Sequence, residues 1–171
     1  MKQKGINPDS ITVLDKLSII GSSGMGALEY RPSKAFKSSF GNIDFDEIAQ
    51  ECKFILSNTY TKTLDLLYQL GGSSGGSRPK ILTEINNEDW IIKFPAHVDN
   101  NDIGYMEYKY SLCAKKCGII MNDTQFLSSK LCKGYFGTRR FDRVNSNKIH
   151  MITVSGLLEI NPNEPNLDYN T

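Results

Sequence analysis

The sequence predicts an α+β fold, in which a small, mostly helical subdomain over residues 1–70 precedes a mostly antiparallel sheet with one helix over residues 71–160. Apolar residues recur with the period of a helix before residue 71, whereas runs rich in β-branched and aromatic residues prevail after residue 77. The later runs have the order β-β-α-β-β-β, and their connections are short enough for antiparallel pairing. One low-complexity tract, Gly71 to Ser77, separates the two parts.

The composition is that of a folded, water-soluble chain. It has 171 residues, of which 39% are apolar and 23% are charged. Its 20 Lys and Arg against 19 Asp and Glu leave a formal charge of +1, which argues against direct binding of nucleic acid. No apolar run reaches the ~18 residues of a membrane span, and the N-terminal stretch is polar. We therefore expect a cytoplasmic protein without membrane contact.

Before the tract, the sequence predicts helices and one short strand. Leu14 to Ile20 is an amphipathic helix that ends at Gly21, and Met25 to Tyr30 is a strand that ends at Arg31-Pro32. A longer helix begins at the capping-box pattern of residues 44–47, and a further helix is expected from Thr63 to Leu70. The apolar face of the longer helix consists of Phe45, Ile48, Ala49, Cys52, Ile55 and Leu56.

After the tract, we expect a hairpin followed by a helix. Strands at Lys80 to Ile85 and Trp90 to Phe94 are joined by Asn86 to Asp89, a length that suits a hairpin loop. The helix runs from Tyr105 to Cys117, and Gly118 ends it. Its apolar face consists of Met106, Tyr110, Cys113, Ala114 and Cys117.

Three further strands complete the expected sheet. They are Thr124 to Leu127, Tyr135 to Arg140 and Lys148 to Val154. Residues 161–171 contain two prolines and four asparagines and are expected to form a loop that starts the connection to a further lobe.

The four cysteines lack the paired spacing of a zinc site. Cys113 and Cys117 lie one helical turn apart, but no histidine is near them in the sequence. Because free cysteine is among the most buried residue types, we expect buried thiols and no metal centre.

The Gly/Ser tract has two interpretations. Small residues between structured segments are typical of a flexible linker. The same glycines, placed directly before a strand, would expose backbone N–H groups that converge on phosphate oxygens. The tract matches neither G-x-x-x-x-G-K-[ST] nor G-x-G-x-x-G, so the choice between the two interpretations depends on the residues that follow it.

Two charged residues after the tract favour the phosphate-binding interpretation. Lys93 lies in a β-run where a lone ammonium is costly unless it meets an anion, and the alternative is an edge-strand lysine with its head in water. Glu107 flanks the apolar face of the predicted helix and could reach that lysine. A Gly-rich loop, a strand lysine and a helix glutamate follow one another in this order in a kinase N-lobe.

Asp142 and Asn147 have the D-x-x-x-x-N spacing of a kinase catalytic base and its metal-binding asparagine, but we assign them no such role. They follow Lys93 too closely for a helical lobe to intervene. We expect Asp142 to cap the turn at residues 145–147 or to pair with a neighbouring arginine.

These motifs, in this order and spacing, resemble the HipA family of bacterial serine/threonine kinases, the toxins of toxin–antitoxin modules. The likeness extends from about Leu14 to the C-terminus, where residues 155–169 are similar to the stretch that enters the family's helical lobe. The segments that carry it are Gly72 to Lys80, Ile91 to Pro95, Glu107-Tyr108 and Arg140-Phe141-Asp142-Arg143.

The resemblance implies an ATP site, with Mg²⁺ in the complete kinase. Ser73 would be the autophosphorylated serine, and Glu107 would hold Lys93. Arg139, Arg140 and Phe141 would be the hinge that meets adenine, although Arg139 stands where the family has a glutamate. The implied phosphate-binding residues are Ser73, Ser74, Gly75, Gly76, Ser77, Arg78, Lys80 and Lys93.

The resemblance also implies parts that lie elsewhere. The family's catalytic segment and metal-binding aspartate would follow residue 171, and the start of its N-terminal subdomain would precede Met1. The complete protein would transfer the ATP γ-phosphate to a protein serine, with a HipB-like antitoxin or a separate small N-terminal subdomain protein as partner. The alternative is a non-catalytic binding or regulatory module that docks on an antitoxin–DNA complex.

Because the catalytic segment is expected elsewhere, the pure 171-residue protein should transfer no phosphate from ATP. Incubation with ATP labelled at the γ-phosphate, followed by measurement of label in phosphate and in protein, tests this expectation. Reproducible transfer that Asp142→Asn abolishes would contradict it and make Asp142 a catalytic residue.

Overall fold

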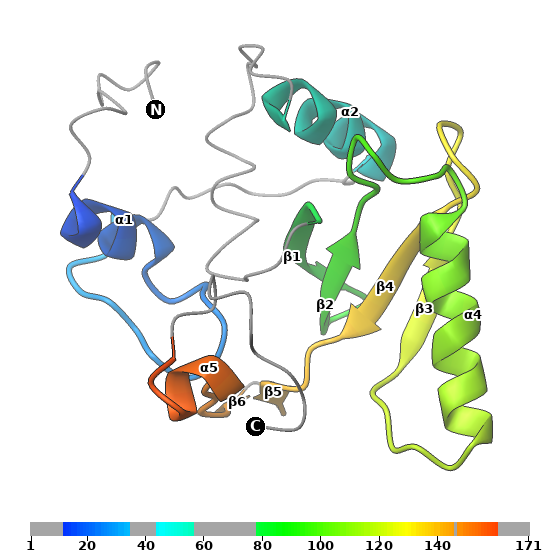
Figure 1. The fold of residues 1–171 in the computed structure, drawn as a ribbon. Coiled ribbons are helices and arrows are strands. Elements are labelled where there is room, and N and C mark those ends of the chain that lie inside the picture. The colour runs from blue at the N-terminus through cyan, green and yellow to red at the C-terminus, as the bar shows by residue number, and fades with distance from the viewer. Residues whose placement is uncertain (1–11, 35–43, 57–77, 146, 161–171) are drawn as a thin grey trace.

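The computed structural model describes residues 12–34, 44–56, 78–145 and 147–160 (Figure 1). As predicted, the fold is α+β, with a four-stranded antiparallel sheet in the order β1-β2-β4-β3. The strands are β1 (Lys80–Ile85), β2 (Glu88–Lys93), β3 (Thr124–Leu127) and β4 (Tyr135–Arg139). Helix α2 (Phe45–Leu56) packs on one face of the sheet, and α4 (Ile103–Lys116) packs on the other.

Three predicted features lie outside the described residues. They are the helix at residues 63–70, the Gly/Ser tract at residues 71–77 and the terminal loop at residues 161–171. Among the residues that are described, no helix is long and apolar enough to cross a bilayer. A cytoplasmic location stays a prediction.

The N-terminal region contains the predicted helix but lacks the predicted strand. In α1 (Val13–Ile20), the Thr12 hydroxyl accepts a hydrogen bond from the Asp15 backbone, and the Asp15 carboxylate accepts one from the Thr12 backbone. Residues 25–30 have no strand partner, so the predicted strand is wrong. Gly26 has a φ of +76°, and its carbonyl and that of Gly24 bind arginine side chains instead of a neighbouring strand.

The β1–β2 hairpin has a tighter loop than the four residues predicted. Only Asn86 and Asn87 connect the strands, and their φ angles are +51° and +63°. Two consecutive left-handed residues give the type I′ turn, whose twist matches that of paired strands. The second strand therefore begins at Glu88, which lies opposite Ile85.

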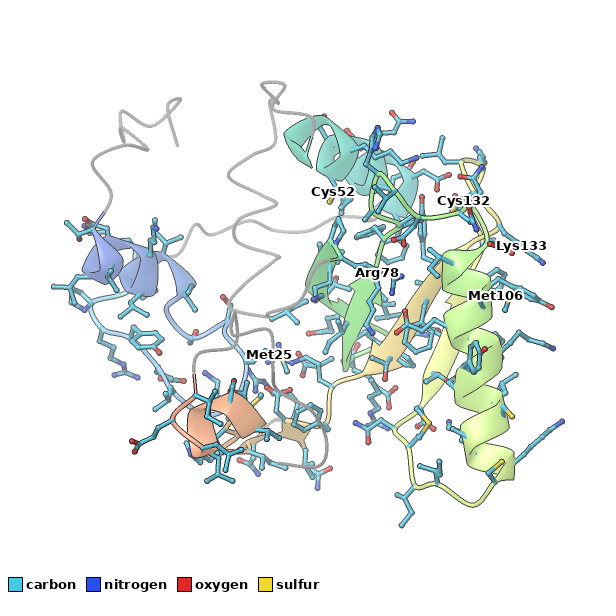
Figure 2. All side chains as sticks on the ribbon, in the orientation of Figure 1. Met25, Cys52, Arg78, Met106, Cys132 and Lys133 are labelled. Atoms are coloured by element: carbon cyan, nitrogen blue, oxygen red, sulfur yellow. The ribbon has the colours of Figure 1, made fainter. Side chains whose placement is uncertain are left out.

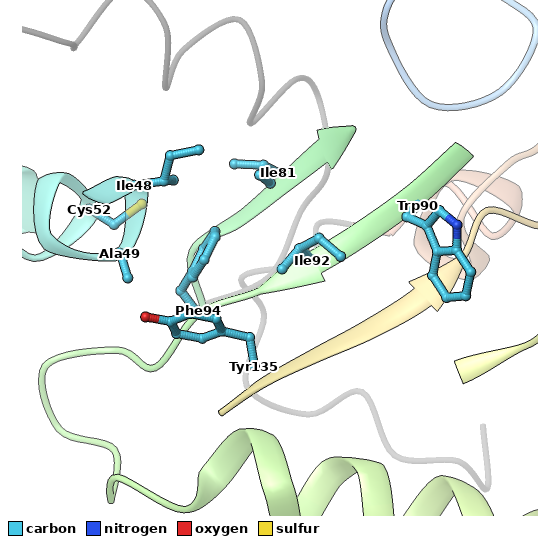
Figure 3. Packing of buried hydrophobic residues seen from close by; sticks show 8 residues of the cluster. All are labelled: Ile48, Ala49, Cys52, Ile81, Trp90, Ile92, Phe94 and Tyr135. Atoms are coloured by element: carbon cyan, nitrogen blue, oxygen red, sulfur yellow. The ribbon is translucent and has the colours of Figure 1, made fainter. Parts of the chain in front are cut away.

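The core lies between α2 and the sheet (Figure 3). Successive strand residues point to opposite faces, so Ile92 and Phe94 face α2 together. Asp46 fastens the helix, because its carboxylate accepts hydrogen bonds from the Tyr135 hydroxyl at 2.8 Å and the Ser129 hydroxyl at 2.6 Å. The buried residues of the cluster are Ile48, Ala49, Cys52, Ile81, Trp90, Ile92, Phe94 and Tyr135.

Helix α4 forms where predicted, but it presents a different face to the sheet. Its buried residues are Gly104 and Ser111, whereas the side chains of the predicted apolar face are largely exposed. A Cβ at Gly104 would lie 2.3 Å from the Gly134 carbonyl oxygen, and the Ser111 hydroxyl lies 3.0 Å from that of Thr124. Small residues let the helix approach the strands closely, and an apolar pattern does not reveal such a contact.

The orientation of α4 also decides the state of two cysteines. Cys113 and Cys117 are exposed, so the prediction of buried thiols is wrong for them, whereas Cys52 is buried and Cys132 is half-buried. Figure 2 shows Cys52 on α2 and Cys132 in the connection between β3 and β4.

The C-terminal region lacks the predicted strand at residues 148–154. Two-residue strands β5 (Arg143–Val144) and β6 (Asn147–Lys148) pair with each other, and α5 (Val154–Leu157) begins after Thr153, whose hydroxyl accepts a hydrogen bond from the Gly156 backbone. Ile152 and Val154 are exposed. Their β-branched side chains fit a strand, but no described sheet face covers them.

Ile92 should be one of the most costly positions to truncate. Its side chain is fully buried in the central strand, so Ile92→Ala should lower the free energy of unfolding by about 2–5 kcal/mol. Urea unfolding followed by circular dichroism measures the change. The matched control is Ile120→Ala, at a side chain that is 100% exposed, which should stay within about 0.5 kcal/mol of wild type. Equal effects of the two substitutions would contradict this description of the core.

Candidate functional site

The α4 face of the sheet carries two lysines beside two aliphatic residues. Ile91 and Lys93 alternate with the core residues of β2, so they face α4. Lys80 lies directly opposite Lys93, and Leu82 lies opposite Ile91, which places all four residues on one face. Two cations thus stand at one end of an apolar strip.

An ion pair joins the central strand to α4. The Lys93 ammonium donates a hydrogen bond to Glu107, and about a third of each side chain is exposed, 32% and 28%. The same ammonium lies 5.3 Å from the centre of the Phe136 ring. Because β2 lies between β1 and β4, Lys93 is not an edge-strand residue. The structure brings the predicted pair together, and its role in binding ATP stays a prediction.

Two further cationic side chains, Lys80 and Arg78, belong to the surroundings of this pair. Burial and the nearby charge of Lys93 lower the pKa of Lys80, and Glu107 opposes that shift. Before β1, the Arg78 guanidinium donates to both oxygens of Asp99, at 2.8 and 3.0 Å. Lys80, Lys93 and Arg78 thus bring three cationic side chains to this part of the described chain.

The Gly/Ser tract connects directly to this charged group, since Ser77 precedes Arg78 in the chain. The predicted phosphate-binding residues of the tract itself, which are Ser73, Ser74, Gly75, Gly76 and Ser77, lie outside the described residues. Their role as a phosphate-binding loop and the modification of Ser73 stay predictions.

The predicted hinge begins at Arg139, the last residue of β4, and part of its backbone is already hydrogen-bonded within the protein. The Arg139 N–H donates to the Asp123 carbonyl at 2.8 Å, and the Arg139 carbonyl accepts from the Asn122 side chain at 3.1 Å. The Arg140 N–H donates to the Asp89 carbonyl at 2.8 Å. Among the described residues, no backbone hydrogen bond involves the Arg140 carbonyl or the N–H and carbonyl of Phe141.

The side chains of the predicted hinge residues point to different surroundings. The Arg139 guanidinium pairs with Glu88 at 3.0 Å and with Asp123 at 3.6 Å, at the surface. Phe141 is 53% exposed, whereas Arg140 is buried. The Arg139 side chain therefore lies at the surface and the Arg140 side chain in the interior, although the two residues are neighbours in the sequence.

Asp142 pairs with neighbouring arginines, which is one of the two alternatives predicted for it. Its side chain is fully buried and accepts from Arg140 at 2.9 and 2.8 Å and from Arg143 at 2.8 Å. The Gly26 N–H adds a fourth hydrogen bond at 2.6 Å. Burial alone would raise the pKa of Asp142, but these hydrogen bonds and the two positive charges outweigh it and hold the pKa below its usual value.

Comparison with known proteins gives one match. A family model described as HipA-like C-terminal domain matches residues 72–171. The matched range begins within the Gly/Ser tract and includes Lys93, Glu107 and the segment around Asp142. Neither a curated protein nor a solved structure matches the chain.

The lowered pKa of Asp142 predicts a loss of stability in acid. Its folded-state value lies below the ~3.9 of an unfolded chain, so the ionised carboxylate stabilises the fold above about pH 4. That contribution disappears as the pH falls through the folded-state pKa. The difference in unfolding free energy between wild type and Asp142→Asn should therefore shrink between pH 6 and pH 3, as measured by urea unfolding.

The matched control is Asp123→Asn, at a carboxylate that is 69% exposed, for which the difference should stay small throughout. An Asp142→Asn difference that is constant from pH 6 to pH 3 would contradict an ionised carboxylate in the fold.

Proposed function

The chain belongs to the family of proteins with a HipA-like C-terminal domain, and from this premise we propose that it forms the ATP-binding part of a serine/threonine kinase that acts as the toxin of a toxin–antitoxin module. One observation carries the proposal. A lysine on the central strand pairs with a glutamate on the helix over that face, close after a Gly/Ser tract. In kinases this pair orients the α- and β-phosphates of ATP.

In the proposed complex, the nucleotide lies along the α4 face of the sheet. The triphosphate meets Lys93 and Lys80, which lie opposite each other on neighbouring strands. Ile91 lies two residues before Lys93 in β2, about 7 Å away, and offers a half-buried apolar surface to the flat face of the base, with the buried Leu82 opposite it on β1. Beyond them, Thr138 lies opposite Ile91, and β4 leads into the hinge. The cations at one end and the hinge at the other match the order of phosphates and base along the nucleotide.

The hinge contacts can be assigned more narrowly than the family resemblance alone allows. The backbone of Arg139 and the N–H of Arg140 already hold the sheet together. The edge of adenine would therefore meet the Arg140 carbonyl and the Phe141 N–H, which offer one acceptor and one donor. The Arg139 side chain faces Glu88 and Asp123 and takes no part in this assignment.

Mg²⁺ would accompany ATP as the partner of its phosphates. Among the described residues, no group of three or more His, Cys, Asp or Glu side chains gathers to hold a metal ion. Transfer of the γ-phosphate to a protein serine, phosphorylation of Ser73 and binding of a HipB-like antitoxin or a separate N-terminal subdomain protein belong to the same proposal and concern the complete kinase.

ATP binding separates this proposal from the alternative, a non-catalytic module that docks on an antitoxin–DNA complex. Loss of a charged hydrogen-bond donor to phosphate costs about 1.5–3 kcal/mol, so Lys93→Met should weaken ATP binding roughly 10- to 100-fold. Isothermal titration measures the dissociation constant, and the fluorescence of Trp90, the single tryptophan of the chain, gives a second readout. Glu107→Gln should weaken binding by a smaller factor, because it leaves the ammonium in place.

The matched control is Lys116→Met, which removes an exposed lysine near the far end of α4 and should leave the affinity unchanged. A wild-type chain that binds no ATP would refute the proposal and favour the docking module. Equal affinities of wild type and Lys93→Met would remove Lys93 from the site.

A further inference from the structure

We propose that Asp142 is a positioning residue for the nucleotide hinge. Through Arg140 and Arg143 it fastens the backbone of Gly24 and Gly26 to the segment that follows β4, and this attachment fixes the hinge groups that meet adenine. The inference rests on the proposed function, because it assumes that the hinge binds adenine. We call these five residues the clamp.

The contacts of the clamp connect two segments 116 to 119 residues apart. The Gly24 carbonyl accepts one hydrogen bond from Arg140 and one from Arg143, each at 3.0 Å. The Gly26 carbonyl accepts from Arg143 at 3.0 Å, and the Gly26 N–H donates to Asp142 at 2.6 Å. Each segment therefore supplies hydrogen-bond donors and acceptors that pair with those of the other segment.

Burial makes this mutual dependence strong. The side chains of Arg140, Asp142 and Arg143 are 4%, 0% and 10% exposed. Two guanidinium groups share the Asp142 carboxylate, and Asp89 also attracts Arg143, but these carboxylates leave guanidinium N–H donors that need other acceptors. The two glycine carbonyls complete the set, and a buried ionic group that loses a partner is strongly destabilised. The segment at residues 24–26 is thus a required part of the ionic cluster.

The clamp holds the hinge on both sides of the expected adenine contacts. Arg140 and Asp142 flank Phe141, and both of their side chains turn into the clamp, whereas the Phe141 side chain is half exposed. The backbone is anchored as well, because the Arg140 N–H donates to Asp89 and the Asp142 carbonyl accepts from Ile149. The Arg140 carbonyl and the Phe141 N–H lie between these anchors, so a change in the clamp displaces them.

The N-terminal segment has little freedom to shift in this position. Gly26 adopts a φ of +76°, and a Cβ there would lie 2.8 Å from the Met151 side chain. The backbone of residues 24–26 passes between the clamp arginines on one side and the segment before α5 on the other.

The test separates positioning of adenine from general support of the fold. Adenosine probes the hinge end of the site in the full chain, and inorganic tripolyphosphate probes the lysine end. Arg143→Lys keeps the charge but loses the paired donors to Gly24 and Gly26. We expect it to weaken adenosine binding roughly tenfold and to change tripolyphosphate binding by less than about twofold, whereas Lys93→Met should do the reverse.

Equal weakening of both ligands by Arg143→Lys would overturn the inference and leave the clamp as structural support. A wild-type chain that binds neither ligand would overturn the proposed function, and the inference with it. Binding of tripolyphosphate without adenosine would overturn the hinge assignment alone.

A second measurement needs no variant. If the clamp strengthens the binding of adenosine, then the binding of adenosine must stabilise the clamp by the same free energy. Adenosine should therefore slow hydrogen exchange of the Gly26 N–H, the donor to Asp142, severalfold in the wild-type chain, whereas tripolyphosphate should not. Exchange of that amide that is unchanged by saturating adenosine would overturn the inference.

Discussion

The site depends on the position of β2 between two paired strands. Both edges of this central strand are hydrogen-bonded to neighbouring strands, and its side chains alternate between the two faces of the sheet. Ile92 completes the core under α2, and this placement forces the next residue, Lys93, onto the α4 face. There the partly buried ammonium requires a carboxylate, which Glu107 provides from α4. The alternation that builds the core thus also places the charge and dictates which face of α4 must meet the sheet.

Two ionic groups in the molecule differ in exposure, and this difference suits them to different tasks. The Lys93–Glu107 pair is about one third exposed, so water shares its solvation and either member can gain or exchange a partner at modest cost. The Asp142 carboxylate is fully buried and makes all its hydrogen bonds within the protein. Removing one partner there leaves a charge in a poorly solvating interior. The first group can respond to a ligand, whereas the second can only hold a shape.

Local patterns in the sequence predict the elements better than they predict their surroundings. Capping residues and apolar periods locate α1, α2 and α4, and β3 has the bounds predicted for it. The orientation of α4 could not be predicted, because it depends on the close approach of Gly104 to Gly134, which leaves no apolar signal. Lys93 and Glu107 could be paired because their order is informative, whereas nothing near Asp142 in the sequence indicates that Gly24 and Gly26, more than a hundred residues earlier, complete its surroundings.

The strand order β1-β2-β4-β3 has a consequence for how the chain reaches its fold. The β1–β2 hairpin closes over two residues and the β3–β4 pair over a short connection, so both form from local contacts. The pairing of β2 with β4 is the seam between these two pairs of strands, and it brings together residues that α4 and β3 separate in the sequence. Since contacts distant in the sequence set the folding rate, we expect this seam to form late and α4 to dock with it. The lysine and the glutamate would then meet only in the last stage of folding.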